Sequence, residues 1–61
     1  MEHTIKYIFT HDAHPKAELS FWVEYDGAYD ESALSNRAYG LLQEVHPTSW
    51  HDWRYLESFE V

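Results

Sequence analysis

Residues 17–25 alternate strictly along the chain, and no other feature constrains the fold of this protein as tightly. Four apolar side chains occupy one set of alternating positions: Leu19, Phe21, Val23 and Tyr25. Because successive side chains of a strand point to opposite faces of a sheet, this set is expected to pack on a core. Trp22 falls in the other set, together with Ser20 and Glu24. The segment therefore predicts a strand that buries one face and presents a tryptophan on the other.

A first strand precedes this segment and a helix follows it. Residues 4–9 are rich in β-branched and aromatic side chains, which favour a strand. Its inner face is expected to carry Ile5, Tyr7 and Phe9. Over residues 31–45 the apolar spacing becomes helical, and Asp30 or Ser32 can cap the helix start. The apolar stripe of the helix consists of Leu34, Ala38, Leu41, Leu42 and Val45.

The third predicted strand, residues 53–61, has conflicting faces. Four apolar side chains share one parity: Trp53, Tyr55, Phe59 and Val61. The same parity would also bury Glu57, which is unfavourable for an unpaired carboxylate. We therefore expect a β-bulge near Leu56-Glu57.

These segments predict an α+β fold in β-β-α-β order, with the whole chain, residues 1–61, as a single domain. In the simplest arrangement, strand one lies in the centre of a three-stranded antiparallel sheet of order 2-1-3, and the helix covers one face. The first hairpin and the loop after the helix would share one end of the molecule. The termini and the loop before the helix would share the other end.

Length and composition restrict how this fold is stabilised. A chain of 61 residues builds one thin core, and without cysteine it has neither a disulfide nor a thiolate zinc site. With 18% aromatic residues, aromatic packing is expected to supply the stability. The chain start lacks the pattern of a signal peptide, and no apolar run approaches the ~20 residues of a membrane span. We expect a soluble, cytoplasmic protein that contacts no membrane.

A formal net charge of −7 argues against direct binding to DNA or RNA, because the 4 basic residues are scattered. The predicted topology gathers acids at the end that holds the termini: Glu2, Glu24, Asp26, Asp30, Glu31, Glu60 and the carboxylate of Val61. No Lys or Arg is expected there. Such a cluster would attract a basic, nucleic-acid-binding protein by imitating a nucleic-acid backbone. Alternatively, the carboxylates only keep the protein in solution.

Aromatic side chains outside the predicted core favour binding to a protein partner. Trp22 is expected on the open sheet face beside Ile8, and it is the first candidate for an interface hot spot. Tyr29 in the acidic loop and Tyr39 on the helix are also expected outside the core. In the alternative interpretation, Trp22 and Ile8 cover each other, or the loop with Trp50 covers them. A homodimer through the open face or a free edge strand is the third alternative.

Metal binding and catalysis have weaker support in the sequence. Four histidines would gather at the end opposite the acids: His11, His14, His46 and His51. Their spacing matches no established set of metal ligands, so surface histidines are the preferred interpretation and no metal or cofactor is predicted. Ser49, His51 and Asp52 have the residue types of a hydrolase triad, but they lie too close together in one loop for its geometry. We expect a non-enzymatic protein.

One segment combines aromatic and acidic side chains, Glu24-Tyr25-Asp26-Gly27-Ala28-Tyr29-Asp30-Glu31. With this segment, its acidity, its size, its lack of cysteine and its β-β-α-β order, the chain resembles small phage-encoded inhibitors of the anti-CRISPR type. The resemblance implies a protein that blocks a nucleic-acid-binding protein, such as a CRISPR effector subunit, in the cytoplasm of a host cell. Inhibitors of host RNA polymerase or nucleases fit equally well. An antitoxin or accessory subunit that binds through the open sheet face is the alternative of another class.

Overall fold

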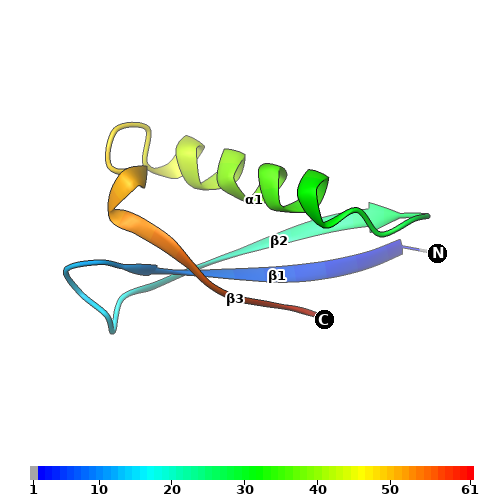
Figure 1. Ribbon diagram of the computed structural model, residues 1–61, viewed down its shortest axis with the longest axis horizontal. Helices are drawn as coiled ribbons and strands as arrows, with labels where there is room; N and C mark the ends of the chain where they lie inside the picture. Colours follow the sequence, from blue (N-terminus) through cyan, green and yellow to red (C-terminus); the bar gives the residue numbers. More distant parts are fainter. Residues whose placement is uncertain (1) are drawn as a thin grey trace.

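A computed structural model describes residues 2–61 of the chain. Its elements are β1 (Glu2–His11), β2 (Glu18–Asp26), α1 (Glu31–Val45), the short 3₁₀ helix η1 (Trp50–Asp52) and β3 (Trp53–Glu60). The strands form a three-stranded sheet of order β2-β1-β3, and both neighbouring pairs are antiparallel. This arrangement confirms the predicted α+β class, element order and strand order (Figure 1).

The topology also divides the loops between two ends of the molecule, as predicted. Figure 1 shows the start of β1 and the β2–α1 loop at one end, with the end of β3 in the same half of the molecule, and the β1–β2 hairpin and the α1–β3 connection at the other end. The molecule is elongated along this direction, with extents of 38 × 21 × 15 Å. Charged residues of distant segments can therefore meet at either end.

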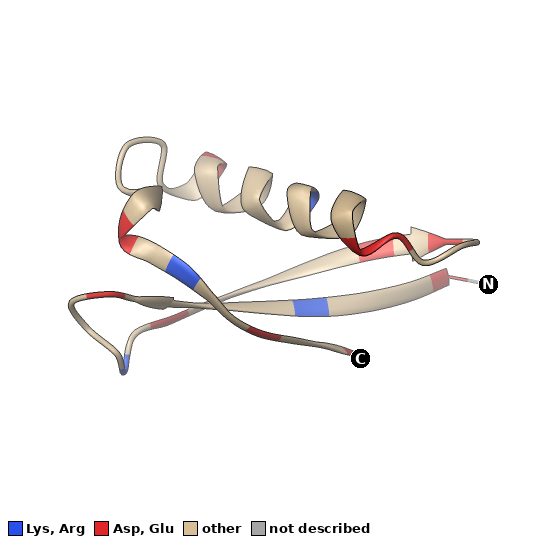
Figure 2. Cartoon of the chain, viewed as in Figure 1, with Lys and Arg blue, Asp and Glu red and all other residues tan. Residues whose placement is uncertain are grey.

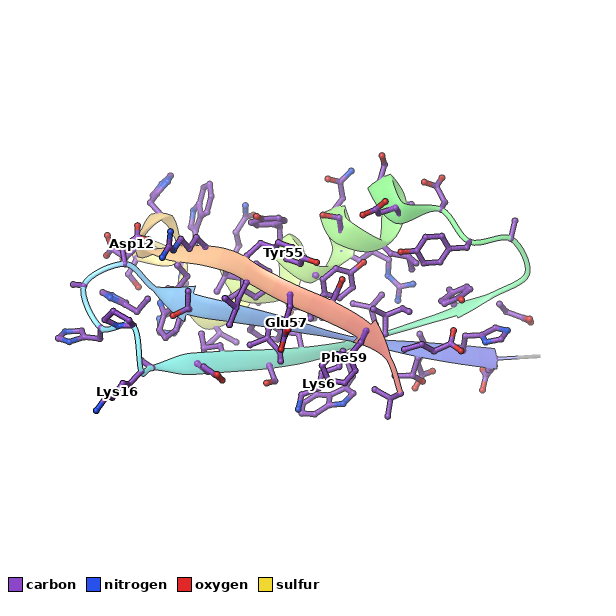
Figure 3. All side chains as sticks on the ribbon, turned by 60° about the horizontal axis from the view of Figure 1, so that its bottom comes forward. Lys6, Asp12, Lys16, Tyr55, Glu57 and Phe59 are labelled. Atoms are coloured by element: carbon purple, nitrogen blue, oxygen red, sulfur yellow. The ribbon has the colours of Figure 1, made fainter. Side chains whose placement is uncertain are left out.

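A β-bulge in β3 confirms the irregularity expected near Leu56-Glu57. Ile8 of β1 is opposite Glu57, whereas the next residue, Phe9, is opposite Tyr55, so Leu56 is the extra residue. Tyr55 therefore lies on the face covered by α1, and Phe59 lies on the open face (Figure 3). Tyr55 and Phe59 share a parity in the sequence but not a face of the sheet, because the extra residue of the predicted bulge exchanges the two faces.

The core lies between α1 and the covered face of the sheet. Its buried residues are Ile5, Tyr7, Phe9, Val23, Leu34, Ala38 and Leu42. Two predictions about the helix were wrong. Val45 is 55% exposed, because it is the last residue of α1, where the chain turns away from the sheet. Tyr39 was expected outside the core but packs against it, with its ring edge-on to Phe9 at a centroid distance of 5.1 Å.

Local hydrogen bonds explain where α1 begins. Asp30 has an extended backbone, and its Oδ1 accepts a hydrogen bond from the Ala33 N–H at 3.2 Å. Of the two predicted caps, Asp30 is therefore the one used. Gly27 precedes it with a φ of +88°, a conformation that side chains with a Cβ rarely adopt. The acidic loop is thus held in a defined shape, and Asp30 has a structural role.

Gly40 weakens α1 without an evident structural reason. A Cβ built at this position would meet nothing within 4 Å, so no close approach requires glycine. We expect Gly40→Ala to raise the free energy of unfolding by about 0.5–1 kcal/mol, because alanine loses less backbone entropy in a helix. Urea unfolding followed by circular dichroism measures the change. A decrease in stability would show that the surroundings of Gly40 are tighter than this geometry indicates.

Candidate protein-binding surface

Figure 2 shows acidic residues at both ends of the molecule, and six of the 11 belong to the end of the sheet that holds the termini: Glu2, Glu24, Asp26, Asp30, Glu31 and Glu60. In the register of β1 and β2, Glu2 is opposite Asp26, and Thr4 is opposite Glu24. This parity places the three acids on the open side of the sheet. Asp30 and Glu31 belong to the start of α1, on the other side of the same end. The predicted acidic cluster is therefore brought together at one end, but it is divided between the two sides of the sheet.

Basic side chains also reach this end, so the prediction that no Lys or Arg lies there was wrong. The Arg37 Nη1 donates a hydrogen bond to the Glu24 carbonyl at 2.8 Å, because its long side chain extends from α1 to β2. The carboxylate of Glu60 also has a partner, His3, whose Nδ1 lies 3.3 Å from Oε1. Both partners are on the covered side of the sheet. We expect the acids of the open side to take part in attraction of a basic protein, because they share that face with the exposed Trp22.

An aromatic cluster that the sequence did not predict surrounds Glu60. The rings of His3 and Tyr25 are stacked at 5.0 Å, and Tyr29 meets Tyr25 edge-on at 5.6 Å. The Tyr25 hydroxyl donates a hydrogen bond to Glu60 Oε1 at 3.1 Å. Desolvation and this interaction raise the pKa of Tyr25 above its usual value, so its hydroxyl remains a donor at neutral pH. Tyr29, 55% exposed, extends this cluster to the surface.

The open face of the sheet presents two aromatic rings around one ammonium group. Lys6 of β1 is opposite Trp22 of β2 and Phe59 of β3. Its Nζ lies 5.4 Å from the Trp22 ring centroid and 5.9 Å from that of Phe59, within the range of cation–π contacts (Figure 3). Trp22 is 56% exposed and Phe59 46% exposed. The prediction that Trp22 lies on the open face is confirmed, and sequence reasoning missed its partner Phe59.

Neither alternative covering of Trp22 is observed. Trp50 packs against the core on the side of α1 and so does not cover the open face. Ile8 is buried, but Trp22 itself keeps more than half of its surface exposed. The predicted partner-binding residues therefore separate into two groups. Trp22, Glu24 and Asp26 belong to the open face, and the other group consists of Tyr29, Asp30, Glu31 and Glu60.

Several predicted histidines do gather at the end opposite the acids. The rings of His11 and His14 lie 5.1 Å apart, and His46 stacks on Trp53 at 5.4 Å. Asp12 pairs with Arg54 at 3.4 Å. Within residues 2–61, however, no group of three or more His, Cys, Asp or Glu side chains is arranged to hold a metal ion. Contacts with Trp53 position two of these histidines, because His11 also meets its ring edge-on at 5.0 Å.

A groove of about 240 Å³ lies between α1 and β3. Its lining consists of Tyr7, Glu31, Ser35, Tyr39, Tyr55 and Ser58. The groove exists because α1 packs toward β2 and leaves the side of β3 uncovered. At its wall, the hydroxyl of Tyr7 is buried and has no hydrogen-bond partner among the described residues.

The unpaired hydroxyl of Tyr7 leads to a prediction about stability and its pH dependence. Burial, and then the nearby Tyr29, Tyr55 and Glu31, raise the pKa of Tyr7 above 10.0. Above this pH the folded protein binds more protons than the unfolded chain, so stability decreases as pH rises. We expect Tyr7→Phe to stabilise the fold by about 1 kcal/mol at pH 7 and to weaken this alkaline loss.

Urea unfolding at pH 7 and at pH 11 measures both effects of Tyr7→Phe. Tyr55→Phe is the matched control, because Tyr55 is 46% exposed and its hydroxyl lies 2.8 Å from Ser58 Oγ. The control should not stabilise the protein at pH 7. Destabilisation by Tyr7→Phe would contradict the assignment of an unpaired hydroxyl.

No family model, curated protein or solved structure matches this chain. In the described part, residues 2–61, no helix is long and apolar enough to cross a membrane. The fold is that of an α+β domain with one helix on a three-stranded antiparallel sheet. Its candidate binding surface consists of the acidic end and the adjoining open face.

Proposed function

We propose that this protein is a non-enzymatic inhibitor whose acidic surface imitates nucleic acid and blocks a basic, nucleic-acid-binding protein. The observation that carries the proposal is the position of Glu2, Glu24 and Asp26 on the open side of one end, in a chain of net charge −7. Carboxylates there would take the place of phosphates in the basic groove of the partner. A CRISPR effector subunit, a host RNA polymerase or a nuclease would be suitable targets.

Trp22 would supply apolar anchoring beside these charges. It lies two residues from Glu24 on the same strand and faces the same side of the sheet. Long-range attraction between the acidic end and a basic groove would raise the association rate, and salt would reduce it. Burial of an exposed tryptophan at the centre of the interface would then slow dissociation. The acidic end would thus determine how fast the complex forms, and Trp22 would determine how long it lasts.

Capture from a host lysate tests the proposal. The immobilised protein is incubated with the lysate, and bound proteins are eluted with a DNA competitor or with increasing salt. A nucleic-acid-binding protein released by either treatment would support mimicry and would identify the target. A captured partner that neither DNA nor salt releases would contradict it.

The aromatic pair around Lys6 favours a second candidate, an antitoxin or accessory subunit that binds through the open sheet face. Trp22 and Phe59 expose large apolar rings on either side of Lys6, and an exposed apolar patch can mark a protein-binding site. Binding of this kind would depend little on salt, because apolar burial would provide most of the affinity. Self-association through this face would instead appear as a concentration-dependent mass in sedimentation.

A further inference from the structure

The groove between α1 and β3 has the chemistry of a site for a cation. Three tyrosine rings and two serine hydroxyls line it, and Glu31 is the only charged residue of its lining. The basic side chains at the acidic end do not line the groove, since Arg37 extends to β2 and His3 pairs with Glu60. A negative charge and aromatic faces without a basic neighbour favour a positively charged occupant.

The buried hydroxyl of Tyr7 is an independent indication of a polar occupant. Tyr7 is 3% exposed, and its hydroxyl has no hydrogen-bond partner within residues 2–61. Buried polar groups are nearly always paired, because an unmade hydrogen bond leaves the cost of desolvation uncompensated. A ligand group that enters the groove would provide the missing partner. An unpaired buried polar group in a native structure therefore calls for an explanation, and a ligand that supplies the missing hydrogen bond is one.

We propose that this groove binds the guanidinium group of an arginine side chain from the basic partner. The inference rests on the proposed function, which provides a basic partner, and it names the part of that partner which enters the groove. The volume of about 240 Å³ is below the roughly 300–1,000 Å³ of sites for drug-sized ligands, so a single side chain is a suitable occupant. Guanidinium carries donors only, which matches a lining of hydroxyl and carboxylate oxygens.

Arginine fits this lining better than lysine. Its planar guanidinium stacks on aromatic rings and is more weakly hydrated than an ammonium group. Tyr39 and Tyr55 supply the rings, and the carboxylate of Glu31 accepts a charge-assisted hydrogen bond. The Tyr7 hydroxyl is buried in the free protein, so side chains of the groove lining have to shift before the guanidinium group reaches it. Tyr55 is the most exposed ring of this lining, at 46%, and its movement would loosen its contacts with the rings of Tyr7 and Phe9 at 6.3 and 6.4 Å.

The test uses a capped pentapeptide, acetyl-Gly-Gly-Arg-Gly-Gly-amide, titrated into the isotope-labelled full chain. Nuclear magnetic resonance follows the ring signals of Tyr7, Tyr39 and Tyr55. We expect saturable shifts of these signals with the arginine peptide. The same peptide with citrulline, a neutral analogue of arginine, should bind much more weakly, because its ureido group donates hydrogen bonds but carries no positive charge. A peptide with lysine in that position should bind more weakly.

Two charge-removing variants make the test specific. Glu31→Gln should weaken binding of the arginine peptide about fivefold or more, because the charge-assisted hydrogen bond is lost. Glu44→Gln is the matched control, since it removes an equal charge from an exposed position of α1 outside the groove. The affinity of Glu44→Gln for the arginine peptide should equal that of the unaltered protein. Backbone spectra of both variants must first show that the fold is retained.

The inference would be overturned by no shift with the arginine peptide, by equal shifts with citrulline, or by equal losses in Glu31→Gln and Glu44→Gln. Equal binding of the lysine peptide would also overturn it, because the groove would then accept any cation.

The proposed function is tested separately by capture of a partner from lysate. If a salt-sensitive partner is captured but the peptide does not bind, the groove inference fails and the proposed function survives. If the peptide binds but only salt-resistant partners are captured, the proposed function fails while the cation site stands.

Discussion

Replacing Phe9 by alanine is expected to remove a large part of the protein's free energy of unfolding. Phe9 is 0% exposed and touches the rings of Phe21, Tyr39 and Tyr55 at centroid distances of 5.9, 5.1 and 6.4 Å. Truncation of a buried phenylalanine costs about 3–5 kcal/mol. At about 0.05–0.15 kcal/mol per residue, a domain of 61 residues has only some 3–9 kcal/mol in total. One substitution can therefore remove most of its stability.

Circular dichroism and urea unfolding measure the effect of Phe9→Ala. Phe59→Ala is the matched control, because it removes the same side chain from the open face, where Phe59 is 46% exposed. We expect the control to cost no more than about 1 kcal/mol, the usual range for a surface substitution with partial burial. A cooperative transition of nearly unchanged midpoint in Phe9→Ala would show that the core does not depend on this aromatic cluster.

The strands and the helix could be predicted because their apolar patterns are local and regular. The alternation of residues 18–26 allows only one face to be buried, and Val23 is indeed 2% exposed. The charge conflict at Glu57 even indicated the bulge. The sequence did not identify the extra residue of the bulge. The faces of the side chains around it could therefore not be predicted. Phe59 has the same parity as Trp53 and Tyr55, yet the bulge places it on the open face.

The candidate site was predicted less completely, because it depends on how the helix lies across the sheet. The acids are gathered at one end by strand order alone, which the sequence could indicate. The groove, by contrast, exists because α1 lies toward β2, and no local pattern determines that offset. Tyr39 packs beside this groove for the same reason, although its position in the helix indicated the surface. Contacts made by long side chains, such as that of Arg37 with Glu24, are likewise set by tertiary distances.

Reversing two charges on the open side of the acidic end is expected to reduce partner binding at least about tenfold, through slower association. The variant is Glu2→Lys with Glu24→Lys, both exposed strand positions. Neither substitution removes a known structural contact, because Arg37 binds the carbonyl of Glu24 and not its carboxylate. Asp30 is left unchanged, since its reversal would remove the cap of α1 and confuse binding with folding.

Glu18→Lys with Glu44→Lys is the matched control for this variant. It changes the net charge equally, but at exposed positions of the opposite end, in the first residue of β2 and the last turn of α1. Surface plasmon resonance with the captured partner should show a slow association rate and weak salt dependence for the first variant only. Equal losses in both would mean that net charge acts without a defined surface. If neither matters and Trp22→Ala instead costs about 2 kcal/mol or more, the open sheet face is the interface and the acids serve solubility.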